Sequence, residues 1–408
     1  MITDKVKGLL AFSIAALFFT YEYVLRVLPS LIVQPLMKQF HATALQIGFL
    51  GAFYFYMLFG AQLIVGPIID RFSARLILSL SSIMCALTIY LFTMSTTLVE
   101  GELSRLFLGL GSAFAYPLMN LLIQNWQKPQ QFTTYSGVGT AIAIFSFAGC
   151  SIGFTMLIKT MEWQVIGISL TWFGGVLAVI AGLFVSNKKV PILTHKNHPR
   201  SDTGFSHNLK KLLKLKIFWL LFAVTFLYFM AITNIFALWG VNFLKQAQHM
   251  SDTQASWTNA CAFFGMGCGV VIFGVWAAYF PWHKFFISVS AIISAVILFI
   301  IIYVQFGFVT MSVFYFLLGF SSGPAISLYC LAKEIPDKNV VGTSLAIINM
   351  ASLLGAVIFQ PIIGHILDLY WQGGIVDGAR VFSTHAYAMA FLLIPCCQIV
   401  GGMLAIFL

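Results

Sequence analysis

Two side chains of opposite charge interrupt the first long apolar run of the chain. In FFTYEYVLRVLPS, residues 18–30, Glu22 and Arg26 stand four positions apart. Side chains at that spacing meet on one face of a helix, so the simplest thing they can do is neutralise each other. A guanidinium also binds carboxylates well, and a buried carboxyl group can take up a proton. Which chemistry applies depends on the solvent around the helix that carries them.

The composition places these charges in a lipid bilayer. Of 408 residues, 60% are hydrophobic and 8% are charged, and the mean hydropathy is +0.95. Soluble domains carry about 25% charged residues. A chain this poor in charge cannot cover its surface with polar groups in water, so we expect a membrane protein.

Runs of about 20 apolar residues, the length that crosses the hydrocarbon core, recur along the chain. They lie at 8–33, 43–68, 76–98, 103–125, 133–158, 165–186, 217–243, 253–279, 285–305, 308–331, 341–363 and 383–407. The sequence therefore predicts an all-α membrane protein with twelve transmembrane helices. These form two six-helix bundles, residues 1–186 and 217–408, joined by a basic linker at 187–216.

The basic residues indicate the orientation. With the amino terminus inside, sixteen of the 22 lysines and arginines fall on the inner side; four, Lys38, Lys159, Lys245 and Arg380, fall outside. Because short cytoplasmic loops carry the excess of basic residues, both termini are expected in the cytoplasm. The net charge of +10 then reflects topology, and no nucleic-acid partner is predicted.

The two groups of spans resemble each other. GTAIAIF at 139–145 matches GTSLAII at 342–348, GLGSAFAYP at 109–117 pairs with GFSSGP at 319–324, and GPIIDRFSAR at 66–75 pairs with GVWAAYFPWHK at 274–284. These spacings are all close to half the chain length and indicate a duplicated six-helix unit. Parallel halves of this kind place a substrate site near the midplane and work by alternating access.

Two motifs resemble those of the major facilitator superfamily, and the resemblance extends over the whole chain. GPIIDRFSAR resembles its cytoplasmic loop motif, and SRLFLGLGSAF at 104–114 resembles the Arg-and-Gly motif of its fourth span. The resemblance implies a secondary transporter. It implies gating by Asp70, Arg71 and Arg75 and a role for Arg105 in substrate binding or proton coupling.

Some segments depart from the family pattern, and others resemble particular branches of the superfamily. Ala278 and Tyr279 replace the Asp-Arg pair in the second half, and GCSIG at 149–153 lacks the Gly-Pro pair of drug/proton antiporters. YEYVLRVLPS, GSAFAYP and QPIIGHILD resemble organic-anion and nutrient carriers and the branch that contains lysosomal dipeptide carriers. The first departure implies a weaker latch in the second half, and the second makes multidrug efflux less favoured.

The depth of the charged residues in the bilayer limits what they can do. Glu22 lies about 20 Å into the first span at 1.5 Å per residue, and Arg105 reaches a similar depth from the outer side. A lone charge at mid-bilayer costs on the order of 3 kcal/mol, so it faces a partner or a cavity. Glu22 and Arg26 either neutralise each other, or Arg26 and Arg105 leave surplus positive charge for an anionic substrate while Glu22 carries the proton.

Other polar or aromatic residues at mid-depth are candidates for substrate binding, although each can equally serve helix packing. They are Tyr23, Tyr54, Tyr116, Asn120, Asn234, Trp239, Asn349 and Gln360. Tyr56 lies nearly opposite Tyr54 on the same helix, so at most one of the two is expected to line a cavity.

These observations predict a monomeric proton symporter for a small carboxylate-bearing solute, in the inner membrane of a bacterium. The solute is an organic acid, an amino acid or short peptide, or a carboxylate siderophore. Proton-antiport efflux, uniport and a substrate sensor remain alternatives. No nucleophile–base constellation or nucleotide-binding loop indicates an enzyme or an ATP-driven pump, and no cofactor is predicted. The seven cysteines lack metal-ligand spacing, and His195, His198 and His207 lie in a polar loop, so no metal site is predicted.

Overall fold

The computed structural model describes residues 4–128, 131–186, 211–280, 282–334 and 341–408. Within these residues, twelve helical segments are long and apolar enough to cross a membrane. They are Lys5–Leu31, Ala44–Ile69, Ala74–Met94, Leu98–Trp126, Thr134–Ile158, Trp163–Phe184, Lys216–Gln246, Asp252–Ala277, His283–Tyr303, Phe308–Lys333, Thr343–Leu369 and Thr384–Ala405. The predicted number of spans is confirmed, and most of their ends differ from the prediction by only a few residues.

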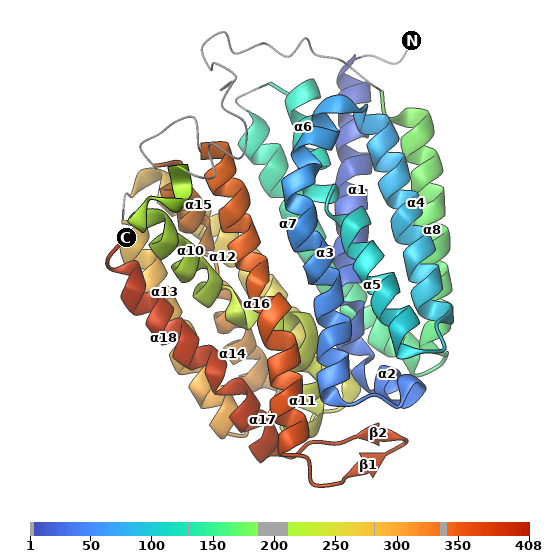
Figure 1. The fold of residues 1–408 in the computed structure, drawn as a ribbon, viewed down its shortest axis with the longest axis vertical. Helices are drawn as coiled ribbons and strands as arrows, with labels where there is room; N and C mark the ends of the chain where they lie inside the picture. The colour runs from blue at the N-terminus through green and yellow to red at the C-terminus, as the bar shows by residue number, and fades with distance from the viewer. Residues whose placement is uncertain (1–3, 129–130, 187–210, 281, 335–340) are drawn as a thin grey trace. The chain divides into compact units, whose positions relative to one another are not determined.

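The chain divides into two compact units. The first comprises Met1–Ala42 and Phe49–Leu193, and the second comprises Thr43–Gly48 and Thr194–Leu408. Helices of the first unit are α1 (Asp4–Leu31), α2 (Val33–Phe40), most of α3 (Ala44–Arg71), α4 (Ala74–Met94), α5 (Leu98–Ser112), α6 (Ala115–Trp126), α7 (Phe132–Ile158) and α8 (Trp163–Phe184) (Figure 1).

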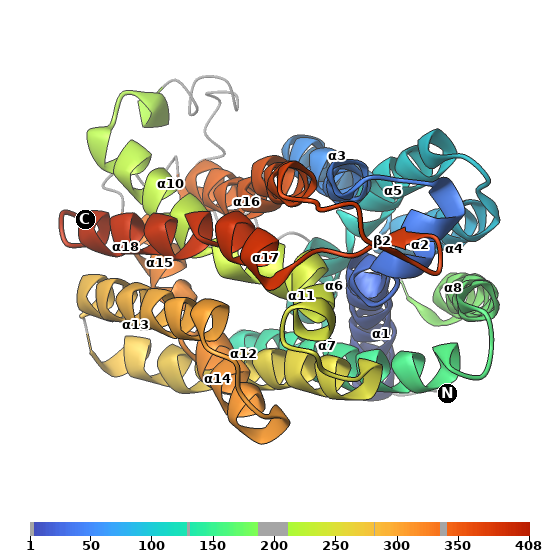
Figure 2. The same cartoon turned by 90° about the horizontal axis from the view of Figure 1, so that it is seen from below.

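The second unit contains a π-helix as well as α-helices. Its elements are α10 (Lys216–Tyr228), the π-helix η2 (Ile232–Trp239), α11 (Gly240–Gln246), α12 (Asp252–Tyr279), α13 (His283–Tyr303), α14 (Phe308–Phe320), α15 (Ala325–Lys333), α16 (Val341–Leu369), α17 (Thr384–Phe391) and α18 (Leu393–Ala405). Helices α13 and α18 run side by side in both Figure 1 and Figure 2. The Ser288 hydroxyl of α13 donates to the carbonyl of Gly402 in α18 at 2.7 Å. No pattern noted in the sequence predicts the π-helix.

Polar caps fix where several spans begin. The Thr97 side chain accepts a hydrogen bond from the backbone N–H of Glu100, and the Glu100 carboxylate accepts one from the backbone N–H of Thr97. Ser251 and Gln254 form the same arrangement at the start of α12. Each capping box satisfies backbone N–H groups that have no partner within the helix. Such polar pairs just before an apolar run explain the sharp span boundaries.

The fourth span of each unit is broken at the place where the sequence repeats. Helix α5 gives way to α6 at Ala113 and Phe114, and α14 gives way to α15 between Ser321 and Pro324. A proline follows each break, and its missing N–H and bulky ring disfavour an unbroken ladder of hydrogen bonds. GLGSAFAYP and GFSSGP therefore mark equivalent helix interruptions.

Glycines allow the second and fourth spans of each unit to touch. A Cβ at Gly109 of α5 would overlap the carbonyl oxygen of Tyr54 in α3, and a Cβ at Gly319 of α14 would overlap that of Ala262 in α12. Close backbone approach of this kind is a general use of small residues in membrane helices. It sets Tyr54 firmly against α5.

A short β-hairpin between α16 and α17 is also not expected from an all-α sequence pattern (Figure 1). Strands β1 (Ile375–Val376) and β2 (Ala379–Arg380) pair antiparallel, with φ of 52° at Asp377 and 82° at Gly378 in the turn. Asp-Gly is a preferred pair for such a two-residue turn, so this signal was present in the sequence and was missed.

Candidate functional site

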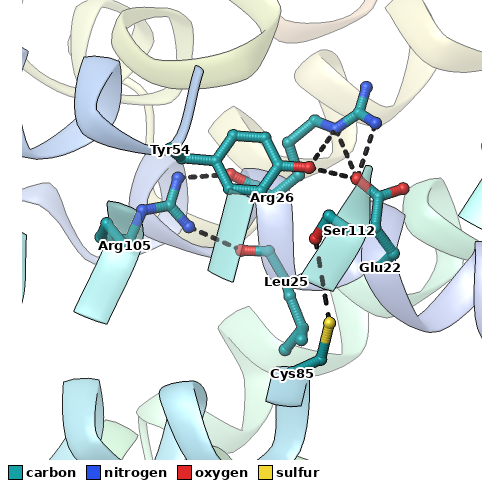
Figure 3. Close-up of polar contacts among 7 residues, drawn as sticks. All are labelled: Glu22, Leu25, Arg26, Tyr54, Cys85, Arg105 and Ser112. Carbon is teal, nitrogen blue, oxygen red and sulfur yellow. Dashed lines mark hydrogen bonds and ion pairs between the residues drawn. The ribbon is translucent and has the colours of Figure 1, made fainter. Parts of the chain in front are cut away.

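Glu22, Arg26 and Tyr54 form one hydrogen-bonded cluster inside the first unit (Figure 3). Arg26 donates to Oε1 of Glu22 from Nη2 at 2.6 Å and from Nε at 3.0 Å. The Tyr54 hydroxyl donates to the same oxygen and lies 3.2 Å from Arg26 Nε. The ion pair indicated by the spacing of four residues is therefore formed, and α3 supplies a third member.

The cluster is one-sided. Oε1 of Glu22 receives all three hydrogen bonds, whereas Oε2 is buried and has no partner among the described residues. On the arginine, Nη1 makes no hydrogen bond within the described part of the chain, and Figure 3 shows it turned away from the carboxylate. The Glu22 side chain is 1% exposed and that of Arg26 is 20% exposed. The arginine is therefore the more accessible of the two charged groups.

Arg105 reaches the same region but bonds to the backbone of α1. Its Nη1 donates to the carbonyl of Leu25 at 3.0 Å and its Nη2 to the carbonyl of Arg26 at 3.1 Å. Pro29 lies inside α1 and has no N–H for the Leu25 carbonyl four residues earlier, so Arg105 satisfies an acceptor that the helix cannot. Part of its charge is thus used to hold α1 in place.

The Tyr54 ring lies between the two guanidinium groups (Figure 3). The Cζ atom of Arg105 is 4.9 Å from the ring centroid and that of Arg26 is 5.8 Å away. A phenol ring has a negative face that attracts cations, so one aromatic side chain helps to hold two like charges in one region. The convergence of Arg26 and Arg105 that the sequence suggests is thus mediated by Tyr54.

The other candidates of the first unit form an aromatic path beside the cluster. Tyr23 lies under the Arg26 guanidinium, with Cζ 4.8 Å from its ring centroid, and Phe19 contacts both Tyr23 and Tyr116. Tyr116 is 47% exposed. Asn120 accepts a hydrogen bond from Ser136 at 2.8 Å. The structure brings Tyr23 and Tyr54 directly to Arg26, and it places Tyr116 one ring further away.

Three candidates of the second unit meet at the π-helix. Trp239 Nε1 lies 3.3 Å from the carbonyl of Gln360, whose side-chain Nε2 donates to the carbonyl of Thr233 at 2.8 Å, and Asn234 Nδ2 donates to that of Met230 at 2.8 Å. The fourth candidate, Asn349, instead accepts from Tyr329 at 3.2 Å. Asn259 of α12 also donates to the π-helix, at the carbonyl of Phe236, and was not singled out from the sequence.

The expected gate and linker are described only in part. The side chain of Asp70 and residues 187–210, which include the three loop histidines, lie outside the described residues. Arg71 and Arg75 are exposed at the end of α3 and the start of α4. The gating role of this loop stays a prediction. Among the described residues, no group of His, Cys, Asp and Glu could hold a metal ion.

Comparison with protein families identifies the superfamily of this chain. The sequence pattern of the Major Facilitator Superfamily matches residues 9–241 and, in a second match, residues 221–407. The chain belongs to this superfamily, as its loop and fourth-span motifs predicted. It is a multi-pass membrane transporter of the secondary type and not an enzyme.

Solved structures share the fold at low sequence identity. A bacterial homolog of the human lysosomal transporter Spinster, in an inward-facing and unoccupied conformation, has a TM-score of 0.72 at 14% identity, over 99% of this chain and 95% of that one. Its occupied form has a TM-score of 0.68 at 15% identity, over 97% and 94%. A mutant of the nucleoside transporter NupG has a TM-score of 0.72 at 14% identity, over 99% of both chains. Curated protein sequences give no match.

Proposed function

We propose that this transporter carries a small carboxylate-bearing solute together with protons, with Arg26 binding the acid group and Glu22 carrying the proton. The observation that supports this proposal is the one-sided ion pair. Arg26 has an unbonded nitrogen on a partly exposed side chain, and Glu22 has an unbonded oxygen on a buried one. Each partner thus keeps a free position for a second ligand.

The arginine suits an acid group for geometric reasons. Its planar guanidinium offers parallel N–H donors that match the two oxygens of a carboxylate. Nη1 is free for the first of these bonds, and Nη2 becomes free when it leaves Glu22. The ring of Tyr23 lies beneath the guanidinium and supports it in either position.

Proton coupling arises in this proposal because the solute draws Arg26 away from Glu22. A solute carboxylate that takes Arg26 leaves Glu22 buried without its cation, and a buried unpaired charge is strongly disfavoured. A proton from water then binds Oε2 and leaves Oε1 available to the Tyr54 hydroxyl. When the solute departs on the other side, Arg26 returns to Glu22 and the proton is released there.

The remaining candidates complete the proposal. Arg105 keeps α1 and Tyr54 in position and adds to the positive potential. The other mid-depth candidates are proposed as further solute contacts, each within its own unit: Tyr116 and Asn120 in the first, and Asn234, Trp239, Asn349 and Gln360 in the second. We further propose that the Asp70, Arg71 and Arg75 loop gates the cytoplasmic side, and that the protein works as a monomer in a bacterial cytoplasmic membrane.

Uptake by proteoliposomes under an imposed pH gradient tests this function. Labelled succinate, lactate, alanine and alanyl-alanine are offered to the wild type, to Arg26→Ala and to Lys38→Ala, which removes an exposed lysine of α2. We expect acid uptake to follow the inward proton gradient and to fall about 100-fold in Arg26→Ala, because loss of one partner of a buried guanidinium–carboxylate contact has an effect of this order.

The Lys38→Ala variant is expected to transport like the wild type, which separates the loss of a particular cation from a general change in charge. Transport of acids by Arg26→Ala at the wild-type rate would contradict the proposal. Uptake driven by an outward proton gradient would instead identify an antiporter, and gradient-independent uptake a uniporter.

A further inference from the structure

The structure assigns a second ligand site to the π-helix of the second unit. We propose that the side-chain oxygens of Asn234, Asn259 and Gln360 bind a hydrogen-bond donor group, an amino or hydroxyl group, on the transported solute. This inference rests on the proposed function and narrows its substrate class. The preferred solute would be an acid that also carries such a donor.

All three amides use their nitrogen and leave their oxygen unpartnered. Asn234 Nδ2 donates to the carbonyls of Met230 and Gly355 at 2.8 and 3.4 Å, Gln360 Nε2 donates to that of Thr233 at 2.8 Å, and Asn259 Nδ2 donates to that of Phe236 at 3.4 Å. Among the described residues, the oxygens of these three amides have no hydrogen-bond partner.

The orientation of the amides follows from their neighbours. A backbone carbonyl can only accept a hydrogen bond, so the side-chain atom that faces it must be the NH₂ group. Within the described part of the chain, the partners of the three amides are backbone carbonyls and the Thr233 hydroxyl, and none of them is charged. The three free positions are therefore neutral acceptors.

Leaving such atoms buried is unfavourable. Asn234 and Asn259 are 0% exposed and Gln360 is 1% exposed, so bulk water does not satisfy their oxygens in this conformation. A buried acceptor without a donor costs about 1–3 kcal/mol. Three of these around one eight-residue helical segment indicate a place that is completed by a ligand.

The π-helix explains why the amides gather here. Its i→i+5 hydrogen bonds widen the turn, as in the bond from Gly240 N–H to the Ile235 carbonyl, and such segments are common at functional sites. The amides brace this element from α12 and α16. Gly355 allows α16 to approach, because a Cβ there would lie 2.8 Å from the Thr233 hydroxyl.

The chemistry of the ligand follows from that of the site. Amide oxygens accept hydrogen bonds and carry partial negative charge, so they disfavour a carboxylate and favour N–H or O–H groups. Its acceptors are thus the chemical opposite of the Arg26 guanidinium, which has only donors.

Matched solute pairs that differ by one donor test this inference. Binding of alanine and propionate, malate and succinate, and alanyl-alanine and N-propionyl-alanine is measured by calorimetry on the full chain in lipid nanodiscs. The variants are Gln360→Met, Asn259→Leu and, as matched control, Gln248→Met. Gln248 also gives its NH₂ to carbonyls, those of Ile301 and Val304, and leaves its oxygen unpartnered, but it contacts the end of α13 and not the π-helix.

We expect the wild type and Gln248→Met to bind the donor-bearing member of at least one pair about tenfold more tightly. Gln360→Met and Asn259→Leu should lose most of that preference and keep their affinity for the acid-only member. A wild type without preference, or variants that keep it, would overturn the inference. So would variants that weaken both members equally while the thermal unfolding temperature stays normal.

Two further measurements separate this site from the function proposed above. Alaninamide has the donor without the acid. If alaninamide binds the wild type but not Gln360→Met, and the acids do not bind, the proposed acid transport fails and the π-helix site stands. If no probe binds, the proposed acid transport and the π-helix site both fail. Exchange of Na⁺ for choline tests whether a Na⁺ ion occupies the site instead of a solute, because neutral amide oxygens can also coordinate a metal cation. Na⁺ stabilisation that is lost in Gln360→Met would make this an ion site and overturn the inference.

Discussion

The two units place different chemistry on the same framework. In each, a glycine of the fourth span lies against a backbone carbonyl of the second span, Gly109 against Tyr54 and Gly319 against Ala262. The first unit uses this contact to hold a tyrosine beside a buried ion pair, whereas the second has an alanine there and gathers neutral amides at a π-helix instead. The packing of the duplicated unit is thus retained while the polar groups differ.

In the mechanism proposed above, this difference separates two tasks. Glu22 changes its charge by taking a proton, so the first unit is proposed to respond to a proton gradient. The described partners of Asn234, Asn259 and Gln360 are neutral, so their region can recognise a donor but has no comparable charge to change. We expect substitutions in the first unit to alter coupling and those at the π-helix to alter selectivity.

The largest expected effect is on coupling. Glu22→Gln keeps an acceptor for Arg26 and Tyr54 and removes the group that takes up the proton. Accumulation against a gradient should therefore fall to simple equilibration, while exchange of labelled for unlabelled solute continues. Both are measured in the same proteoliposomes, with and without a pH gradient. Accumulation by Glu22→Gln that still follows the pH gradient would place the proton site elsewhere.

An intermediate effect is expected at the paired glycines. Gly109→Ala and Gly319→Ala each force a methyl group against a carbonyl, which should lower the free energy of unfolding by about 1–3 kcal/mol in both variants. Only Gly109→Ala should also reduce the ratio of accumulation to exchange, because it displaces Tyr54. Thermal unfolding in detergent and transport by proteoliposomes measure the two quantities.

Gly137→Ala supplies the control for the glycine pair, since a Cβ there has open space around it and should change neither quantity. Equal loss of coupling in Gly109→Ala and Gly319→Ala would show that the two contacts are functionally alike.

The smallest effect concerns a single hydroxyl. Tyr54→Phe removes one of three donors to Oε1 of Glu22, and uptake at fixed pH should fall about 2- to 12-fold, the range expected for one ordinary hydrogen bond. Tyr315→Phe is the matched control, because that tyrosine is also fully buried and its hydroxyl has no partner among the described residues. Initial rates of the two variants are compared; equal rates would remove Tyr54 from the coupling mechanism.

Much of the fold was predictable from local patterns. Apolar runs of bilayer length predicted the twelve spans, because length and hydropathy are properties of neighbouring residues. The spacing of Glu22 and Arg26 indicated their contact for the same reason. The repeated GLGSAFAYP and GFSSGP segments pointed to equivalent positions, and these are where the two fourth spans break.

Arg105 shows where such patterns are insufficient. From the sequence it is a second buried cation, available to an anion. In the structure it donates to the carbonyls of Leu25 and Arg26, which are 80 and 79 residues away. Pro29 frees the first carbonyl, but the sequence does not tell which donor will reach it.

The sequence by itself determined that this chain crosses a membrane, how often it crosses, and that one span carries an ion pair. Those properties depend on residues a few positions apart. The tertiary structure decided that Tyr54, 32 residues away, shares Oε1 of Glu22 with Arg26, and that amides from three segments brace a π-helix, with Gln360 bonding a carbonyl 127 residues away. The physical reason is that a buried polar atom takes whichever partner helix packing brings within about 3 Å, and that partner comes from a distant part of the chain.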